Sequence, residues 1–301
     1  MIQYLKHAEI DKKKWDNCIE QAPNGLIYAY SWYLDVVSPG WDALVEGDYE
    51  SVMPLTHRKK LCFNYLYQPN FCQQLGIFSI ESARHNLVER FIESLPKKFQ
   101  FVEVQLNESN QTEAYENLLS QKKTYILDLN KNYTSIKASY SQNHKRNIKK
   151  AYQNNFKLTS GLSAKEIVDF KRKNPVNDLK EFQYKQLEDL VKISFKKKIG
   201  KSLEIFDPNG EILAVAFFIF HKKRVYYILS ATNETGKKGG AMFLIVDYFL
   251  QKYAGNPWIL DFEGSQIPGL ARFYSGFGAT PRYYSKIKIN NLPFPFYLLK
   301  S

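Results

Sequence analysis

The chain has 301 residues, of which 44% are hydrophobic and 15% aromatic, enough apolar side chain for a core and too much for a disordered protein. This length suits two domains of about 150 residues each, or one large domain. The formal net charge of +12 favours a polyanionic partner such as a nucleic acid or a phosphorylated cofactor. Lysine supplies 34 of the 42 basic residues, whereas arginine is the usual side chain for bidentate phosphate contacts, so a solvated lysine-rich surface also explains the charge.

Cysteines, histidines and short motifs exclude several kinds of site. Cys18, Cys62 and Cys72 form no close pair, which excludes a CxxC metal ribbon and argues against a disulfide framework. The five histidines lack metal-ligand spacing, and GxGxxG, GxxxxGK(S/T), HExxH and GxSxG are all missing from the sequence. The first 16 residues resemble no signal peptide, and no apolar run approaches the ~20 residues of a membrane helix. We expect a cytoplasmic protein without a bound metal.

The first part of the chain alternates between helical and strand-like patterns. Helical segments carry apolar residues on one stripe, and strand segments alternate apolar and polar residues. The predicted elements are helices over residues 11–21, 31–37 and 83–95, an antiparallel meander over 43–71 with turns at Gly47-Asp48 and Phe63-Asn64, and strands over 101–106 and 124–129.

Residues 130–155 change character and predict a basic helix that Ser141 or Asn143 caps. Its exposed face is a candidate polyanion-binding surface, formed by Lys145, Arg146, Lys149 and Lys150. We place the boundary between two domains here, which gives domains of residues 1–135 and 136–301. Each half shows helices, a meander, a helix and a strand in the same order, which suggests two diverged copies of one fold.

The last hundred residues predict three meandering strands followed by a glycine-rich loop. A helix is expected from about residue 181, and strands over 203–207, 211–220 and 224–232. The loop, residues 233–240, leads into a helix over 241–253, so its backbone N–H groups and the helix dipole favour an anion. The candidate anion-binding residues are Gly236, Lys237, Lys238, Gly239, Gly240 and Ala241. Alternatively, the glycines only allow a sharp turn between strand and helix.

Two carboxylates and a tyrosine follow this helix. Residues 258–265 predict a strand whose alternation places Asp261 and Glu263 on one face. They either supply a general base or orient an amine nucleophile, or one caps the next helix and the other binds a nearby lysine. A short helix over 268–279 carries Tyr274, either a proton donor to a leaving group or a core tyrosine. Residues 283–289 predict the final strand.

This order of strand, glycine-rich loop, helix, strand, aromatic helix and strand resembles the GNAT acyltransferase fold. It is most similar to the FemABX-type branch, which carries two such domains in tandem. The resemblance spans about residues 25–290 and rests on segments 68–78, 141–151, 239–250 and 260–279. It implies an α+β fold (mixed α/β) of two tandem GNAT-like domains, each with a mixed, mostly antiparallel sheet flanked by helices.

The resemblance implies an acyltransferase that moves an acyl or aminoacyl group to an amine acceptor. FemABX enzymes use aminoacyl-tRNA as donor and a cell-wall precursor peptide as acceptor. Ordinary GNAT enzymes use acyl-CoA, whose pyrophosphate binds a loop of pattern (Arg/Gln)-x-x-Gly-x-(Gly/Ala). Gly239 and Ala241 match its last two positions, but Gly236 stands at the Arg/Gln position. This departure favours a FemABX-like donor, and we expect no tightly bound cofactor.

For an N-acyltransferase, we expect Asp261 or Glu263 to accept the amine proton and Tyr274 or Lys286 to lie near the leaving group. Backbone N–H groups of the strand before the glycine loop would stabilise the oxyanion. The alternatives are a CoA-dependent N-acetyltransferase acting on a small amine, and a non-catalytic GNAT-fold protein that binds RNA or another polyanion.

In the N-terminal half, three glutamines stand beside aromatic residues. They are Gln68, Gln73 and Gln74. Such a row of amides either lines a substrate groove or satisfies buried backbone groups.

Overall fold

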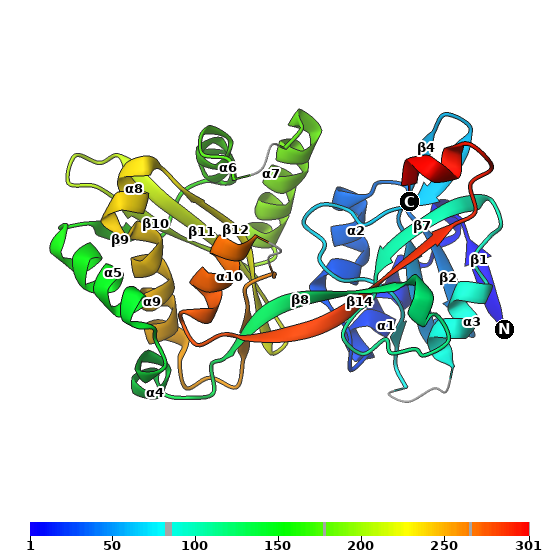
Figure 1. The fold of residues 1–301 in the computed structure, drawn as a ribbon, viewed down its shortest axis with the longest axis horizontal. Coiled ribbons are helices and arrows are strands. Elements are labelled where there is room, and N and C mark those ends of the chain that lie inside the picture. The colour runs from blue at the N-terminus through cyan, green and yellow to red at the C-terminus, as the bar shows by residue number, and fades with distance from the viewer. Residues whose placement is uncertain (82–85, 177–178, 265–266, 301) are drawn as a thin grey trace. The chain divides into compact units, whose positions relative to one another are not determined.

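The computed structural model describes residues 1–81, 86–176, 179–264 and 267–300 (Figure 1). The chain folds into two compact units, Met1–Lys122 with Tyr283–Ser301, and Lys123–Arg282. This division differs from the expected domains 1–135 and 136–301, because the end of the chain belongs to the first unit. Its strand hydrogen-bonds there, and short-range sequence patterns do not reveal such long-range pairing.

The first unit contains a four-stranded sheet of order β1-β2-β3-β6 and a second group of neighbouring strands, β4-β5-β7-β14. Its core includes Trp15 of α1, whose indole N–H donates to the carbonyl of Ala29 at 2.7 Å. The elements are β1 (Ile2–Leu5), α1 (Lys12–Gln21), α2 (Ser31–Val37), β2 (Asp42–Glu46), β3 (Ser51–Leu55), β4 (His57–Lys60), β5 (Phe63–Leu66), β6 (Phe78–Ser79), α3 (Leu87–Glu93), β7 (Phe99–Gln105) and β14 (Thr280–Asn290), the last of which begins just before the unit boundary.

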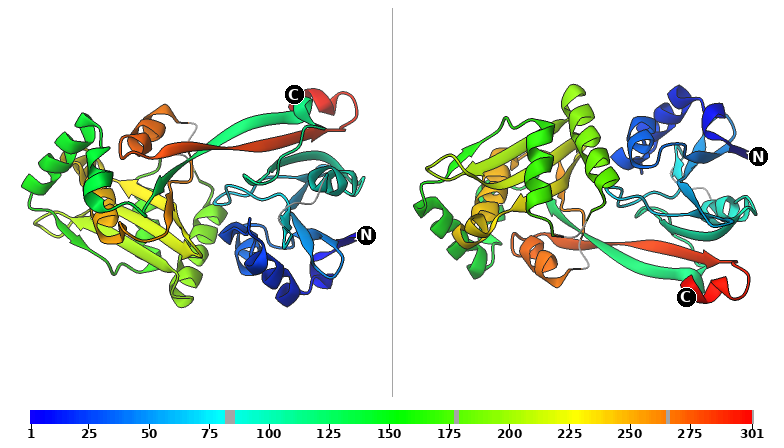
Figure 2. Two further views of the ribbon diagram at one scale, coloured as in Figure 1. Left: turned by 90° about the horizontal axis from the view of Figure 1, so that it is seen from below. Right: turned by 90° about the horizontal axis from the view of Figure 1, so that it is seen from above.

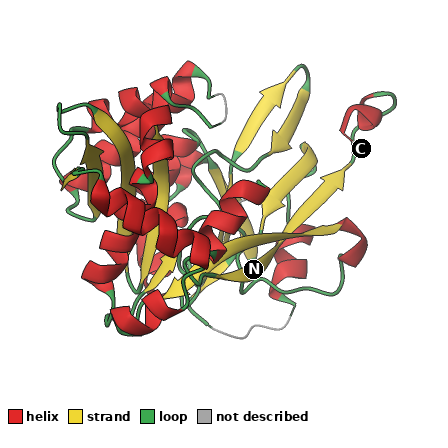
Figure 3. Ribbon diagram, turned by 60° about the vertical axis from the view of Figure 1, so that its left-hand side comes forward, coloured by secondary structure: helices red, strands yellow, loops and turns green. Residues whose placement is uncertain are grey.

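The second unit is built on strands of order β8-β13-β12-β11-β10-β9. Figure 2 shows its helices on both sides of these strands, and Figure 3 colours helices and strands separately. The elements are β8 (Leu119–Asp128), α4 (Tyr133–Ala138), α5 (Gln142–Gln153), β9 (Lys157–Thr159), α6 (Ala164–Lys173), α7 (Glu181–Lys196), β10 (Gly200–Phe206), β11 (Ile212–His221), β12 (Arg224–Thr232), α8 (Glu234–Gly239), α9 (Ala241–Tyr253), β13 (Ile259–Asp261) and α10 (Pro268–Ser275).

Two consecutive phenylalanines of β11 explain why both faces of this sheet are covered. Successive strand residues point to opposite faces. Phe218 stacks on Phe249 of α9 with ring centroids 4.3 Å apart, whereas Phe217 meets Phe195 of α7 at 5.3 Å. Both phenylalanines of β11 are buried, so the nearly continuous apolar run of this strand reflects a sheet between two helical layers.

The two units share one strand arrangement. In the first, β5 and β7 are parallel neighbours and α3 connects them; in the second, β12 and β13 are parallel neighbours and α9 lies between them in sequence. β7 then pairs antiparallel with β14, and β13 with β8. β8, which follows the first copy in sequence, therefore pairs with a strand of the second copy. β14, which follows the second copy, pairs with a strand of the first. The α+β fold class is confirmed, with one antiparallel sheet of four strands and one mixed sheet of ten strands in the described part of the chain.

Most predicted elements form, including the helix after Ser141, whose hydroxyl accepts the N–H of His144. Three predictions are corrected. The turn expected at Phe63-Asn64 lies at Leu61-Cys62, where Leu61 takes a left-handed φ of 56°. The expected loop 233–240 is largely helix α8. The strand expected over 258–265 ends at Asp261. Residues 83–85 of the predicted helix and Ser265 lie outside the described residues.

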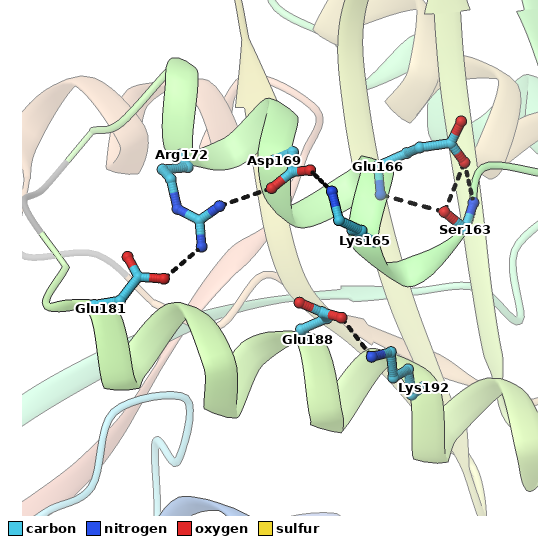
Figure 4. A network of polar contacts seen from close by, with 8 residues as sticks. All are labelled: Ser163, Lys165, Glu166, Asp169, Arg172, Glu181, Glu188 and Lys192. Atoms are coloured by element: carbon cyan, nitrogen blue, oxygen red, sulfur yellow. Dashed lines mark hydrogen bonds and ion pairs between the residues drawn. The ribbon is translucent and has the colours of Figure 1, made fainter.

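Exposed ion pairs join α6 to the start of α7 (Figure 4). Arg172 contacts Asp169 at 2.7 Å and Glu181 at 2.9 Å. Ser163 and Glu166 form a capping box at the N-terminus of α6. Exposed pairs contribute little stability individually, but Arg172 bridges the two helices. The adjacent Lys171 therefore points from an anchored turn towards the sheet.

Candidate active site

A cavity of about 260 Å³ opens in the second unit beside β12. Its wall is mainly apolar and aromatic, with a few polar groups, as is usual for small-ligand sites. The lining residues are Tyr227, Ser230, Ala231 and Thr232 of β12, Gly236 and Lys237 of α8, Gly240, Met242 and Phe243 at the start of α9, Leu270, Phe273 and Tyr274 of α10, and Asn174, Pro175 and Val176 after α6.

The cavity lies where β12 continues beyond its pairing with β13. The two strands pair only over Arg224–Tyr226, and the cavity begins at Tyr227. Opposite Phe217 and Phe218 the register of β12 shifts by one residue at Ile228. A bulge of this kind redirects backbone groups and is common beside active sites. Backbone groups of β12 therefore lie along one wall of the cavity.

Lys171 reaches this wall from α6. Its ammonium donates to the carbonyl of Ser230 at 3.0 Å, and burial lowers the pKa of the Lys171 amine. Sequence analysis did not single out this residue, although Ile167 and Lys171 are four residues apart and therefore lie on one helix face. A lysine on the apolar face of an amphipathic helix indicates a cation that is at least half-buried, as Lys171 is.

Tyr274 and Tyr227 supply the phenols of the cavity. Tyr274 is 6% exposed and stacks on Phe262 with centroids 4.8 Å apart. Burial, followed by the negative charges of Glu263 and Asp261, raises the pKa of Tyr274, so its hydroxyl stays protonated at neutral pH. The hydroxyl of Tyr227 donates to Met242 Sδ at 2.9 Å, and burial raises its pKa also. Both residues are hydrogen-bond donors at neutral pH.

The expected glycine-rich anion loop is a short helix followed by the start of α9. Asn233 caps α8 by accepting the N–H of Gly236 at 2.7 Å, and Lys237 pairs with Glu234 at 2.6 Å. A Cβ on Gly236 would collide with the carbonyl oxygen of Leu213. Any side chain at the Arg/Gln position of the CoA-binding pattern would therefore clash with the backbone of Leu213.

The start of α9 still lies at the cavity. Gly240 takes a left-handed φ of 78°, and a Cβ there would lie 2.9 Å from the carbonyl oxygen of Asn147 on α5. This close approach brings the first turn of α9 to the wall formed by Met242 and Phe243. The positive end of the helix dipole lies at that turn. Lys238, Gly239 and Ala241 belong to this segment but lie outside the cavity lining.

Asp261 is fully buried and does not line the cavity. It accepts the hydroxyl of Thr124 at 2.5 Å and the N–H of Glu263 at 2.9 Å, and Arg224 Nε lies 3.7 Å away. The alternation expected to place Asp261 and Glu263 on one face fails, because β13 ends at Asp261 and Glu263 adopts a left-handed φ of 58°. Asp261 instead holds the backbone of Glu263, which is partly exposed.

The basic residues of α5 form an exposed face, as expected. Lys145, Arg146, Lys149 and Lys150 are all exposed. The buried side of α5 carries His144, which contacts Phe273 of α10. The exposed Tyr152 donates its hydroxyl to Asp247 of α9 at 3.2 Å.

The remaining candidates belong to the first unit. Lys286 on β14 pairs with Glu103 at 3.3 Å. Gln68 accepts the N–H of Gln105 and donates to the carbonyl of Cys72, and Gln74 accepts the N–H of Glu108. Two of the three glutamines thus satisfy backbone groups, one of the two roles considered for them. Gln73 accepts from the Gln74 amide at 3.0 Å.

Comparisons with known proteins identify the fold. No protein-family model matches the sequence, and a sequence search of curated proteins finds no relative. Among solved structures, FemX superposes with a TM-score of 0.66 at 13% identity, over 99% of both chains.

Two further structures agree with this result. L-PGS from Bacillus licheniformis has a TM-score of 0.55 at 11% identity, covering 96% of this chain and 95% of that one. The C-terminal domain of a putative lysylphosphatidylglycerol synthetase from Agrobacterium fabrum has a TM-score of 0.59 at 9% identity, covering 96% and 94%. The chain therefore shares the fold of FemX and of these two structures, which agrees with the FemABX-like resemblance of its sequence.

Proposed function

We propose that this chain, which shares the fold of FemX and of L-PGS, is an acyltransferase that moves an acyl or aminoacyl group to an amine. The observation that carries the proposal is the cavity beside the bulged strand β12, with a protonated phenol, that of Tyr274, in its wall. Backbone and phenolic donors in a confined site suit the oxyanion and the leaving group of acyl transfer.

In the proposed reaction, the amine attacks the donor carbonyl while the carbonyl oxygen lies against β12. The charge that develops on this oxygen is stabilised by backbone N–H groups of the bulged strand and by the nearby ammonium of Lys171. Tyr274 gives its proton to the departing oxygen or sulfur as the bond between that atom and the acyl carbon breaks, and the phenol is then reprotonated through water. Glu263, held in place by Asp261, accepts the amine proton directly or through water.

We favour an aminoacyl ester of tRNA over acyl-CoA as the donor. The reason is the closed position at Gly236, where a side chain would strike the carbonyl of Leu213. The exposed cations of α5 would contact the phosphates of the nucleic acid, and such binding weakens with salt. A cell-wall precursor peptide is the amine acceptor that we propose to test first.

The test is transfer of a radioactive amino acid from total charged tRNA to a synthetic peptide ending in L-Lys-D-Ala-D-Ala, whose lysine supplies the amine. Parallel reactions contain radioactive acetyl-CoA in place of charged tRNA. Label in the peptide with tRNA alone supports the proposed donor, and label with acetyl-CoA alone replaces it. A protein that binds charged tRNA but transfers nothing to this peptide or to other amines would be a binding module.

A cavity-filling variant ties the activity to this site. Leu270 lines the cavity and is partly exposed, so Leu270→Trp adds bulk there with little strain on the core. Transfer should fall at least tenfold while the melting temperature changes little. Leu118→Trp, at an exposed position of the first unit, is the matched control and should keep full activity.

A further inference from the structure

Large apolar side chains are exposed together at two segments of the first unit. Leu61, at the tip of the β4–β5 hairpin, is 75% exposed, and Phe294 and Leu298, near the end of the chain, are 76% and 52% exposed. Single exposed apolar residues are ordinary on protein surfaces. Several in adjoining segments form a patch, and patches of this kind mark interaction sites.

Direct contacts hold these two segments together. The ring of Phe63 in the hairpin packs against Phe296 in the terminal turn, with centroids 4.9 Å apart. The side-chain amide of Asn290 donates to the carbonyl of Tyr297 at 3.0 Å and fixes the start of that turn. A groove of about 360 Å³ between the segments is lined by Leu61, Phe63 and Phe296, among others. We call residues 57–66 with 290–298 the hairpin–tail surface.

The charge of the hairpin–tail surface has one sign. Arg58, Lys59 and Lys60 are exposed beside Leu61, and residues 57–66 and 287–301 contain no Asp or Glu. Lysine and arginine stems lie along apolar surface while their charges reach outwards. The apolar patch is therefore bordered by cations with no acidic residue in either segment.

We propose that the hairpin–tail surface docks on an anionic lipid bilayer. Aromatic residues and leucine beside clustered lysines suit the boundary between acyl chains and headgroups, and a basic cluster is attracted to anionic lipids. The charge complementarity selects this occupant, because a bilayer surface offers both hydrocarbon and negative charge. The docking that we propose is peripheral, through this surface alone; among the described residues no helix is long and apolar enough to cross a membrane. It goes beyond the proposed function, which the soluble-peptide assay tests separately.

The exposed Cys62 provides a reporter inside the proposed contact, since Cys18 and Cys72 are buried. An environment-sensitive fluorophore on Cys62 is titrated with vesicles of phosphatidylglycerol and phosphatidylcholine, and with vesicles of phosphatidylcholine alone. We expect a blue shift of the fluorescence and co-sedimentation with the anionic vesicles. The affinity for neutral vesicles should be at least tenfold weaker. No blue shift or sedimentation with anionic vesicles would overturn the proposal.

Matched variants separate this surface from general basic charge. Unlabelled Leu61→Glu/Phe294→Glu and Lys59→Glu/Lys60→Glu proteins should each lose at least tenfold in vesicle affinity while keeping the wild-type melting temperature. The α5 variant with Lys145, Arg146, Lys149 and Lys150 all changed to Gln should bind vesicles as the wild type does. Equal loss in the α5 variant would overturn the proposal. Light scattering without vesicles provides a second check. A dimer that forms in the wild type and is lost in Leu61→Glu/Phe294→Glu would also overturn the proposal.

Discussion

His144 Nε2 lies 2.8 Å from the carbonyl oxygen of Phe273, and this contact assigns the tautomer of the ring. A carbonyl only accepts, so Nε2 carries the proton and Nδ1 accepts the hydroxyl of Ser141 at 2.8 Å. The neutral imidazole thereby joins the N-terminus of α5 to α10, the helix that carries Tyr274. Burial lowers the pKa of His144, which agrees with a neutral ring.

This contact predicts a pH-dependent stability. Because the pKa of His144 is lower in the folded than in the unfolded chain, where it is about 6.5, the unfolded chain binds the proton more readily. Stability is therefore full above about pH 6.5 and falls as the pH drops below it. The melting temperature at pH 7.5, 6.5 and 5.5 should fall less for His144→Gln than for the wild type. At pH 7.5 the variant should already melt at a lower temperature. Parallel profiles for the two proteins would contradict the assignment.

Tyr274→Phe should reduce the rate of transfer about 10²-fold without a large change in melting temperature, because the ring that stacks on Phe262 is kept. Single-turnover assays with the best donor measure the effect. Tyr125→Phe is the control, since Tyr125 is also buried and neighbours Tyr274 but does not line the cavity. Equal rates for wild type and Tyr274→Phe would remove this phenol from the mechanism.

Gly236→Ala should destabilise the second unit by about 1–3 kcal/mol, because its Cβ would collide with the carbonyl of Leu213 and force backbone movement. Gly236→Arg, which restores the CoA-binding pattern, should be no more stable and should not create CoA binding. Denaturant titrations measure the first effect and calorimetry with CoA the second. Gly269→Ala, a helical glycine with nothing within 4 Å of its Cβ, is the control.

Asp261→Asn should lower stability by about 2 kcal/mol, since an amide group replaces a buried carboxylate oxygen that accepts hydrogen bonds. Thr124→Val removes one of the two donors. If the two side chains act together, the double variant should lose less than the sum of the single losses. A double-mutant cycle from urea denaturation provides this comparison. Additive losses would show that the hydroxyl of Thr124 does not stabilise the carboxylate.

Lys171→Met should separate activity from stability. Replacing a half-buried ammonium with an apolar side chain of similar length should leave the free energy of unfolding unchanged or higher, whereas transfer should fall about tenfold as the charge near β12 is lost. Chemical denaturation and single-turnover rates are measured on the same preparation. Lys173→Met, at an exposed position of α6, is the control. A large loss of stability with unchanged transfer would give Lys171 a structural role only.

Apolar spacing correctly predicted the elements whose partners are close in sequence. The basic helix α5, with Ser141 as its cap out of the two candidates, and the β10–β12 meander both follow from local patterns of side chains. The candidate site was predictable in part, because the glycines before α9 and the aromatic residues of α10 stand in a recognisable order. Tyr274, Gly236 and Lys237, which were chosen from that order, line one cavity.

Other features depend on contacts between distant segments. The exchange of β8 and β14 between the two copies joins residues far apart in the chain, and local periodicity carries no information about such partners. The same holds for Asp261, whose burial depends on Thr124 of β8, and for Gly236, whose missing side chain is explained by the carbonyl of Leu213. Side-chain pattern thus specified most of the helices and strands. Backbone pairing and close approach between remote strands decided which polar groups face the cavity and which are held in the core.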